Sequence, residues 1–268
     1  MLYLCATPIG NLEDMTFRAI RILKEVDLIA AEDTRRTRKL LTHFDIHTPL
    51  IRFDENCKAA VAEKILQRLK AGEEIAVVSD AGLPAISDPG ADLVRLAIDA
   101  GITVCPVPGA NAALTALICS GLDTSKFLFA GFAPKTKKNR REFLEKFSTV
   151  DATIIFYEAP HRLKIFLEEL LEVFGEREAV LARELTKVHE EFLRGTLSEL
   201  IKNLDEPRGE FVVLVEGNKN SAPIEKNPIE FYNELIASGL DKKSAMREAA
   251  KKFNISRREI YNALIVSG

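Results

Sequence analysis

The sequence predicts an α/β protein made of two α/β domains followed by a small helical module. Short apolar runs alternate with helical patterns over residues 2–121, and the alternation resumes over residues 127–216. Beyond these segments only helical patterns follow. Such alternation is typical of sheets with helices on their faces. The expected parts are a first domain at 1–133, a second at 134–217, and a linker with three helices at 218–268.

The first domain is expected to contain a parallel sheet. Its strand patterns fall at residues 2–6, 28–31, 50–53, 75–78 and 103–107, and its helix patterns at 14–26, 34–44, 56–70, 91–100 and 111–121. In the third of these helices, Val61, Ile65 and Leu69 recur at the spacing of one helical face. Ligands of such sheets bind beyond the carboxyl ends of the strands. The site is therefore expected at that edge.

The second domain is expected to follow a basic connection, AGFAPKTKKN. A further strand pattern at residues 127–132 precedes this connection and falls within the expected first domain. The strand patterns of the second domain fall at residues 153–157, 179–182 and 211–216, and its helix patterns at 160–174 and 196–203. Residues 217–228 have the composition of a linker. Helical patterns then begin at Ile229, Asp241 and Ser256, and the last one opens with a capping box formed by Ser256 and Glu259.

Basic residues are concentrated in three segments although the formal net charge is −3. Residues 33–39 hold four basic residues against one acidic residue, residues 134–146 hold six against two, and residues 241–258 hold seven against two. Basic patches on an acidic body favour attraction of a polyanion at particular places. Solvated helix faces would explain any one of these segments equally well.

Membrane, secretory and metal-binding classes are not favoured. The apolar run at residues 2–6 has no basic residue ahead of it and is too short to span a bilayer, so a cytoplasmic protein is expected. The four cysteines show no CxxC spacing. His43 and His47 are four residues apart, but no third ligand accompanies them, so no metal is expected.

Three loops rich in small residues follow strands of the first domain. They read TPIGNLED, SDAGLPAISDPG and PVPGANAAL. Small residues let main-chain groups approach a ligand closely, and three such loops at one sheet edge would suit a nucleoside-sized molecule. Ordinary turn chemistry explains any one of the loops, but it explains three on the same edge less well.

The loops also indicate which nucleosides to exclude. No GxGxxG follows the first strand and no GxxxxGK[ST] occurs in the chain, so neither a dinucleotide nor a nucleoside triphosphate is favoured. The three loops contain no Lys or Arg to bind phosphate groups. A nucleoside with a cationic centre and no phosphate fits better, and Asp80 would face its ribose or its positive group.

Six stretches in this order resemble one known family. They are ATPIGNLEDMT, AAEDTRRTRKLL, VVSDAGLPAISDPG, PVPGANAAL, FYEAPHR and ARELTK, and the resemblance covers residues 2–217. The family is ribosomal RNA small subunit methyltransferase I, a branch of the tetrapyrrole methylase superfamily. The resemblance implies an S-adenosylmethionine-dependent enzyme that methylates the ribose 2′-hydroxyl of a cytidine in the decoding region of 16S ribosomal RNA. It also implies two α/β domains with the cofactor between them, a homodimer, and ribosomal RNA or the 30S subunit as partner.

The resemblance also assigns residues to the cofactor. In place of the superfamily's Gly-Asp-Pro loop this chain has SDAGLP, with Ser79 for the glycine and Ala81 for the proline. The residues implied to bind the cofactor are Pro8, Ile9 and Gly10, then Asp80, Ala81, Gly82 and Leu83, then Asn111 and Ala112, and from the second domain Tyr157 and Ala182.

Catalytic and RNA-binding residues are predicted from the same motifs and from the basic segment at residues 134–146. The catalytic candidates are Asp33 and Glu158 as general bases, with Glu184 and Lys187 behind them. Asp33 could instead be the cap of the following helix, and Glu158 also precedes a helix start. The candidates for binding RNA are Arg35, Arg36, Lys137, Lys138, Arg140, Arg141, His161 and Arg162, and Lys187 is a further candidate for gripping phosphate.

Two other functions stay open on the sequence. One keeps the cofactor and changes the acceptor to a tetrapyrrole precursor. The other is a non-catalytic regulator that binds nucleic acid through the last three helices, which resemble a helix-turn-helix module with Arg257 and Arg258 at its contacting end. A helical cap or a dimer contact would explain the same three helices.

Overall fold

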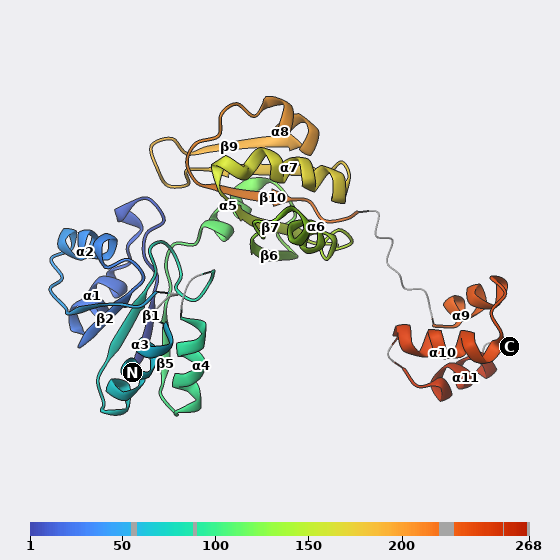
Figure 1. Ribbon diagram of the computed structural model, residues 1–268, viewed down its shortest axis with the longest axis horizontal. Coiled ribbons are helices and arrows are strands. Elements are labelled where there is room, and N and C mark those ends of the chain that lie inside the picture. Colours follow the sequence, from blue (N-terminus) through green and yellow to red (C-terminus); the bar gives the residue numbers. More distant parts are fainter. Residues whose placement is uncertain (55–57, 88–89, 220–227, 254, 267–268) are drawn as a thin grey trace. The chain divides into compact units, whose positions relative to one another are not determined.

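The computed structural model describes residues 1–54, 58–87, 90–219, 228–253 and 255–266 (Figure 1). The chain forms two compact units, Met1–Asn218 and Lys219–Gly268. Most of the linker expected at residues 217–228 lies outside the described residues. Within the described part, no helix combines the length and the apolar character that a bilayer crossing requires.

The first sheet is parallel throughout, as predicted. Its strands are β1 (Leu2–Cys5), β2 (Leu28–Ala31), β3 (Leu50–Arg52), β4 (Ile75–Val78) and β5 (Val104–Val107), in the order β3-β2-β4-β1-β5. The elements between and after them are η1 (Leu12–Asp14), α1 (Phe17–Glu25), α2 (Thr34–His43), α3 (Lys58–Lys70), α4 (Ala91–Asp99) and α5 (Ala112–Ser120). All four residues of β2 and of β4 are buried, because helices cover both faces of this sheet.

The helix expected at residues 14–26 is divided in two by its capping residues. The side chain of Asn11 accepts a hydrogen bond from the backbone N–H of Glu13 and opens η1. Thr16 then caps α1, since its Oγ1 lies 3.1 Å from the backbone nitrogen of Ala19. Each cap satisfies N–H groups that a helix start leaves free.

The second sheet is mixed. Its strands are β6 (Phe127–Phe132), β7 (Thr153–Glu158), β8 (Glu178–Arg183), β9 (Glu191–Thr196) and β10 (Phe211–Val215), in the order β6-β7-β10-β8-β9. β6 runs parallel to β7, whereas the β7–β10, β10–β8 and β8–β9 pairs are antiparallel. The helices of this region are α6 (Lys137–Glu145), α7 (Pro160–Phe174) and α8 (Leu197–Asn203). Two α/β sheets followed by helices are the fold class that the sequence predicts.

The change from the first sheet to the second comes early in the chain. β6 belongs to the second sheet although it precedes residue 134, where the second domain was expected to begin. In addition, Ala116 and Leu117 of α5 pack in one cluster with Val180 and Leu214 of the second sheet. The three-domain division stays a prediction, and the sheet boundary lies closer to residue 121 than to residue 134.

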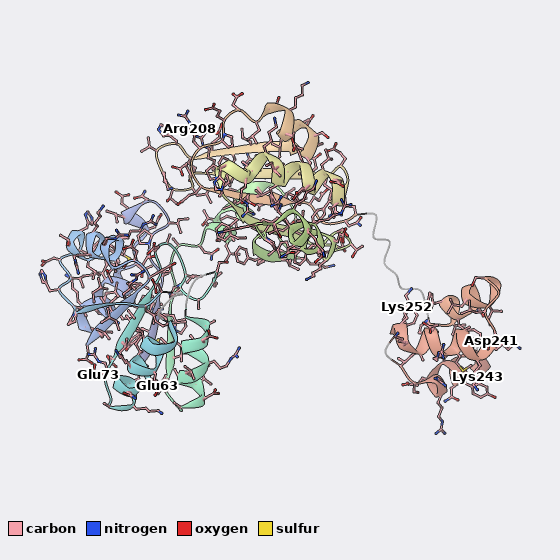
Figure 2. The ribbon with its side chains drawn as sticks, viewed as in Figure 1. Glu63, Glu73, Arg208, Asp241, Lys243 and Lys252 are labelled. Atoms are coloured by element: carbon pink, nitrogen blue, oxygen red, sulfur yellow. The ribbon has the colours of Figure 1, made fainter. Side chains whose placement is uncertain are left out.

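The C-terminal unit has a small core of its own. It contains α9 (Pro228–Ala237), α10 (Lys242–Phe253) and α11 (Arg257–Val266), and its buried residues are Tyr232, Ala245, Ala249, Ala250 and Ile260. Figure 2 labels Lys252 of α10, whose Nζ lies 3.8 Å from the ring centre of Phe231. The expected capping box is present, because Ser256 and Glu259 exchange hydrogen bonds at the start of α11.

Candidate active site

A cavity of about 410 Å³ opens between the carboxyl edge of the first sheet and the second sheet. This volume lies in the range of small-molecule sites, about 300 to 1,000 Å³. The first sheet contributes Ile9, Glu32, Asp80, Ala81, Gly82, Leu83, Ile86, Ser87, Asn111 and Ala112, and the second sheet region contributes Phe132, Tyr157, Glu158, Ala159, Pro160, Ala182, Leu185, Glu210, Phe211 and Val212. Loops after β1, β2, β4 and β5 therefore meet there.

Most of the residues predicted to bind a cofactor line this cavity. They are Ile9, Asp80, Ala81, Gly82, Leu83, Asn111, Ala112, Tyr157 and Ala182. Pro8 and Gly10 flank Ile9 but are not part of the lining. The structure thus brings together the three loops that the sequence places at one sheet edge. Their contact with a cofactor stays a prediction.

Main-chain hydrogen bonds join the loops after β1 and β4. The backbone N–H of Thr7 donates to the carbonyl of Gly82 at 2.9 Å, and the N–H of Gly82 donates to the carbonyl of Thr7 at 3.1 Å. The hydroxyl of Ser79 donates to the Gly82 carbonyl at 3.2 Å. Gly82 has a φ of 77°, a conformation that glycine adopts without strain. Ser79, which stands at the position of the superfamily's glycine, therefore stabilises this loop through its hydroxyl.

Two carboxylates stand at the first-sheet side of the cavity. Oδ1 of Asp80 accepts the backbone N–H of Asp33 at 3.0 Å, and Nη1 of Arg36 lies 3.3 Å from Oδ2 of Asp80. Burial, followed by the charge of Asp80, raises the pKa of Glu32. Carboxylates placed this way can accept hydrogen bonds from ribose hydroxyls or stabilise a positive group.

Sequence reasoning missed Glu32 and Glu210 among the residues that line the cavity. Glu32 directly follows β2, so the rule that ligands bind at strand carboxyl ends could have found it. Glu210 precedes β10 and reaches the cavity only because that strand runs antiparallel to β7 and β8. No local pattern in the sequence indicates that direction.

Glu158 is the one predicted catalytic residue that lines the cavity. Its side chain has no exposed surface, its Oε1 accepts the backbone N–H of Ala159 at 2.8 Å, and its Oε2 lies 2.9 Å from Nη2 of Arg162. Burial raises the pKa of Glu158 against the opposing effect of these hydrogen bonds. A carboxylate with a raised pKa at a cavity wall is suited to accept a proton.

Asp33 has the structural role that the sequence left open for it. It caps α2, because Oδ1 accepts the backbone N–H of Arg35 at 2.8 Å, and it also pairs with the Arg35 side chain. These hydrogen bonds from Arg35 hold the pKa of Asp33 far below its usual range. The carboxylate does not line the cavity and is a poor proton acceptor.

Lys187 is held by two carboxylates beside the cavity. Its Nζ lies 2.9 Å from Oε1 of Glu184 and 2.9 Å from Oε2 of Glu210. Burial disfavours the ammonium, but the hydrogen bonds to Glu210 and Glu184 outweigh it and raise the pKa of Lys187. A lysine that stays protonated cannot serve as a base. The contact with Glu210 instead indicates that Lys187 orients this carboxylate at the cavity wall.

Comparison with known proteins decides which family these features belong to. A family model described as Tetrapyrrole (Corrin/Porphyrin) Methylases matches residues 1–201. Ribosomal RNA small subunit methyltransferase I of Halalkalibacterium halodurans is 52% identical, over 97% of this chain and 93% of that protein. The protein of the same name from Bacillus subtilis is 50% identical, over 98% and 93%.

The chain belongs to the ribosomal RNA small subunit methyltransferase I family of tetrapyrrole methylases. This confirms the resemblance carried by the six motifs. Solved structures agree in fold: diphthine synthase has a TM-score of 0.62 at 14% identity and covers 81% of this chain and 89% of its own. Uroporphyrin-III C-methyltransferase from Thermus thermophilus, complexed with S-adenosyl homocysteine, has a TM-score of 0.58 at 18% identity, covering 81% and 97%.

In this member of the methyltransferase I family, Arg140, which was predicted to bind RNA, lies in the interior. Arg140 is buried, its Nη2 lies 2.7 Å from Oε1 of Glu169, and its Nη1 donates to the carbonyl of Lys135 at 3.0 Å. A guanidinium used in this way cannot contact a phosphate group. The prediction for Arg140 is corrected because its partner, Glu169, comes from a helix 29 residues further along.

The other predicted RNA contacts of this methyltransferase I chain are on the surface or at its edge. Lys137, Lys138, Arg141 and His161 are exposed, and Arg162 is partly buried by its contact with Glu158. Arg141 pairs with Glu145 and Glu172, and Nζ of Lys138 lies 4.0 Å from Glu142. Arg35 and Arg36 are exposed on α2, beside the cavity.

Proposed function

We propose that this protein transfers a methyl group from S-adenosylmethionine to the ribose 2′-hydroxyl of a cytidine in the decoding region of 16S ribosomal RNA. The observation that carries the proposal is the identity of about half the residues, over almost the whole chain, with proteins named ribosomal RNA small subunit methyltransferase I. The cavity at the carboxyl edge of the first sheet is the proposed cofactor site.

The residues of the cavity fit S-adenosylmethionine. The loop from Asp80 to Leu83 offers main-chain groups, and Ile9, Leu83 and Val212 offer apolar surface. Glu32 and Asp80 provide negative charge for a cofactor that carries a sulfonium group. No Lys or Arg lines the cavity among the described residues, which matches a ligand without phosphate. When bound, the cofactor supplies a methyl group already activated by the positive sulfur.

Glu158 is the proposed general base. It would accept the proton of the 2′-hydroxyl while the oxygen bonds to the methyl carbon and the carbon–sulfur bond breaks to leave a neutral thioether. Arg162 and the backbone N–H of Ala159 hold the carboxylate in one orientation. Alignment of the reacting groups can supply about 7 to 11 kcal/mol, and a positioned base adds a factor of about 10² to 10⁴.

The acceptor is tested by offering several substrates to the purified protein with labelled S-adenosylmethionine. We expect label in 30S subunits or 16S RNA, and mass mapping should place it on a cytidine ribose in the decoding region. A tetrapyrrole precursor, the alternative acceptor, is offered in parallel. Label in the tetrapyrrole alone would overturn the proposal, and so would label on a base.

The proposed base is tested with Glu158→Gln, and Asp33→Asn is the matched control. We expect Glu158→Gln to lower kcat by about 10² to 10⁴ while binding of S-adenosylhomocysteine is kept. Asp33→Asn should keep kcat within a few-fold, because asparagine caps helices as well as aspartate does. The reverse result would assign the base to Asp33.

We also propose that the protein is a homodimer in the cytoplasm. Apolar side chains support the first part: Ile118 on α5 is 74% exposed, and Phe127 is exposed on β6, an edge strand of the second sheet. Contact with a second chain would remove these apolar side chains from water. Light scattering at micromolar concentration should give the mass of two chains, and a single-chain mass would refute the dimer.

A further inference from the structure

α2 carries a row of basic side chains and no acidic residue. Its sequence is TRRTRKLLTH, in which Thr37 and Leu41 are buried against the core. Arg35, Arg36, Arg38 and Lys39 are exposed. Positions three and four residues apart share one face of a helix, so Arg35, Arg38 and Lys39 lie together.

The cations of this row differ in their partners. Arg35 pairs with Asp33, and Arg36 pairs with Asp80. Within the described part of the chain, Arg38 and Lys39 have no ion-pair or side-chain hydrogen-bond partner. A shallow depression is lined by Arg35, Arg38, Lys39 and Thr42. The hydroxyl of Thr42 donates to the backbone carbonyl of Arg38 at 2.8 Å, so Arg38 and Lys39 supply the unpaired donors there.

Three of the four cations of α6 are paired with glutamates, although the segment that contains α6 has more basic residues than α2. Arg140 is bound to Glu169 in the interior, Arg141 pairs with two glutamates, and Lys138 lies beside Glu142. Only Lys137 of the four predicted cations of α6 has no partner in the described structure. In the described structure α2 therefore carries two cations without a partner and α6 carries one.

α2 also begins at the proposed cofactor site. Arg36 pairs with Asp80, and Asp80 lines the cavity, as does Glu32, which lies just before the cap residue of α2. From Arg35 to Thr42 the helix rises about 10 Å along its axis. A strand that places one ribose in the cavity could thus continue along this helix.

We propose that Arg38 and Lys39 bind phosphate groups of the ribosomal RNA adjacent to the nucleotide that is methylated. This inference rests on the proposed function and names the surface that holds its substrate. The occupant is an RNA backbone because two neighbouring unpaired cations suit consecutive phosphates, and Arg forms bidentate bonds with phosphate oxygens. Release of counterions from the RNA would contribute to the affinity.

The test compares Arg38→Ala/Lys39→Ala with Lys64→Ala/Lys70→Ala. The control residues are exposed on α3, the helix that Glu63 marks in Figure 2, and their removal changes the charge equally. The affinity for 16S RNA is measured by filter binding at several salt concentrations, and binding of S-adenosylhomocysteine is measured by calorimetry. KM for RNA is measured with the methylation assay.

We expect the α2 variant to lose about tenfold in RNA affinity and to lower the log-log salt slope by about 1.4 to 1.8, at about 0.7 to 0.9 for each phosphate contact. Its affinity for S-adenosylhomocysteine should match that of the wild type. An unchanged slope and KM, or an equal loss in the α3 control, would overturn the inference while RNA methylation by the wild type keeps the proposed function intact. Absence of RNA binding and methylation by the wild type would overturn both.

Discussion

At the scale of single residues, Glu158 couples the candidate site to pH. Burial raises its pKa, so the folded protein holds this proton more tightly than the unfolded chain, whose value is about 4.3. Near and above pH 4.3 the folded state therefore binds more protons than the unfolded chain does. The stability that protonated Glu158 contributes at low pH is lost as the pH rises through its pKa in the folded state.

Glu158→Gln should remove this loss of folding stability with rising pH, because glutamine does not ionise. We expect the melting temperature of the wild type, relative to that of Glu158→Gln, to fall between pH 4 and pH 7. Thermal unfolding followed by circular dichroism at several pH values provides the measurement. If the melting temperature of the wild type instead rises relative to that of Glu158→Gln as pH increases, the ion pair with Arg162 dominates and the pKa of Glu158 is lowered.

Arg140 illustrates how burial decides the effect of a charge. Removing one partner of a buried ion pair costs about 3 to 5 kcal/mol, because the other charge is left without compensation. Exposed pairs contribute about 0 to 1 kcal/mol. We therefore expect Arg140→Ala to lower the free energy of unfolding by about 3 to 5 kcal/mol and Arg141→Ala by less than about 1 kcal/mol. Urea denaturation compares them, and equal losses would contradict the burial of the Arg140–Glu169 pair.

At the scale of elements, two loops from different sheets meet beside the cavity. A Cβ atom added to Gly10 would lie 2.6 Å from Cγ of Lys187 and 3.0 Å from the backbone oxygen of Leu185. Leu185 lines the cavity. Glu184 and Thr186 on either side have φ angles of 49° and 67°. Non-glycine residues hold such angles only where the surrounding structure determines them, so this segment has little freedom to shift.

Gly10→Ala should therefore weaken cofactor binding more than it weakens the fold. We expect at least about a tenfold loss of affinity for S-adenosylhomocysteine, equivalent to about 1.4 kcal/mol. Gly72→Ala is the control, because Gly72 also resists substitution through its φ of 94° but has open space around it. Calorimetry measures the affinity of both variants for S-adenosylhomocysteine. Equal affinities would show that the loops at Gly10 and Leu185 can move apart without affecting the cofactor site.

At the scale of the whole molecule, the two compact units have separate cores. Among the residues that the structure describes, those lining the cavity all belong to Met1–Asn218. A chain ending at Asn218 should therefore fold and bind S-adenosylhomocysteine within about twofold of the full-length affinity, since all of these contacts are kept. Calorimetry on the truncated chain tests this. A large loss of affinity would show that the C-terminal unit completes the cofactor site.

Several features could be predicted from short windows of sequence. Period-two and period-3.6 patterns located the parallel strands and most helices, because the side chains that bury a strand or a helix face recur at the spacing of that element. Loops of small residues located much of the cavity wall, because strand order places their carboxyl ends on one edge. β9 escaped detection since EFLRGT is a partly exposed edge strand with only two apolar residues.

What the sequence by itself determined is therefore the family, the two α/β sheets and the loops around the cavity, all of which depend on residues near one another in the chain. Only the tertiary structure decided which charges are available. Arg140 is neutralised by a glutamate 29 residues away, and Glu158 has a raised pKa because other elements bury it. In the described part of the chain, no acidic side chain pairs with Arg38 or Lys39. Electrostatic roles depend on distances and burial, which the order of residues does not specify.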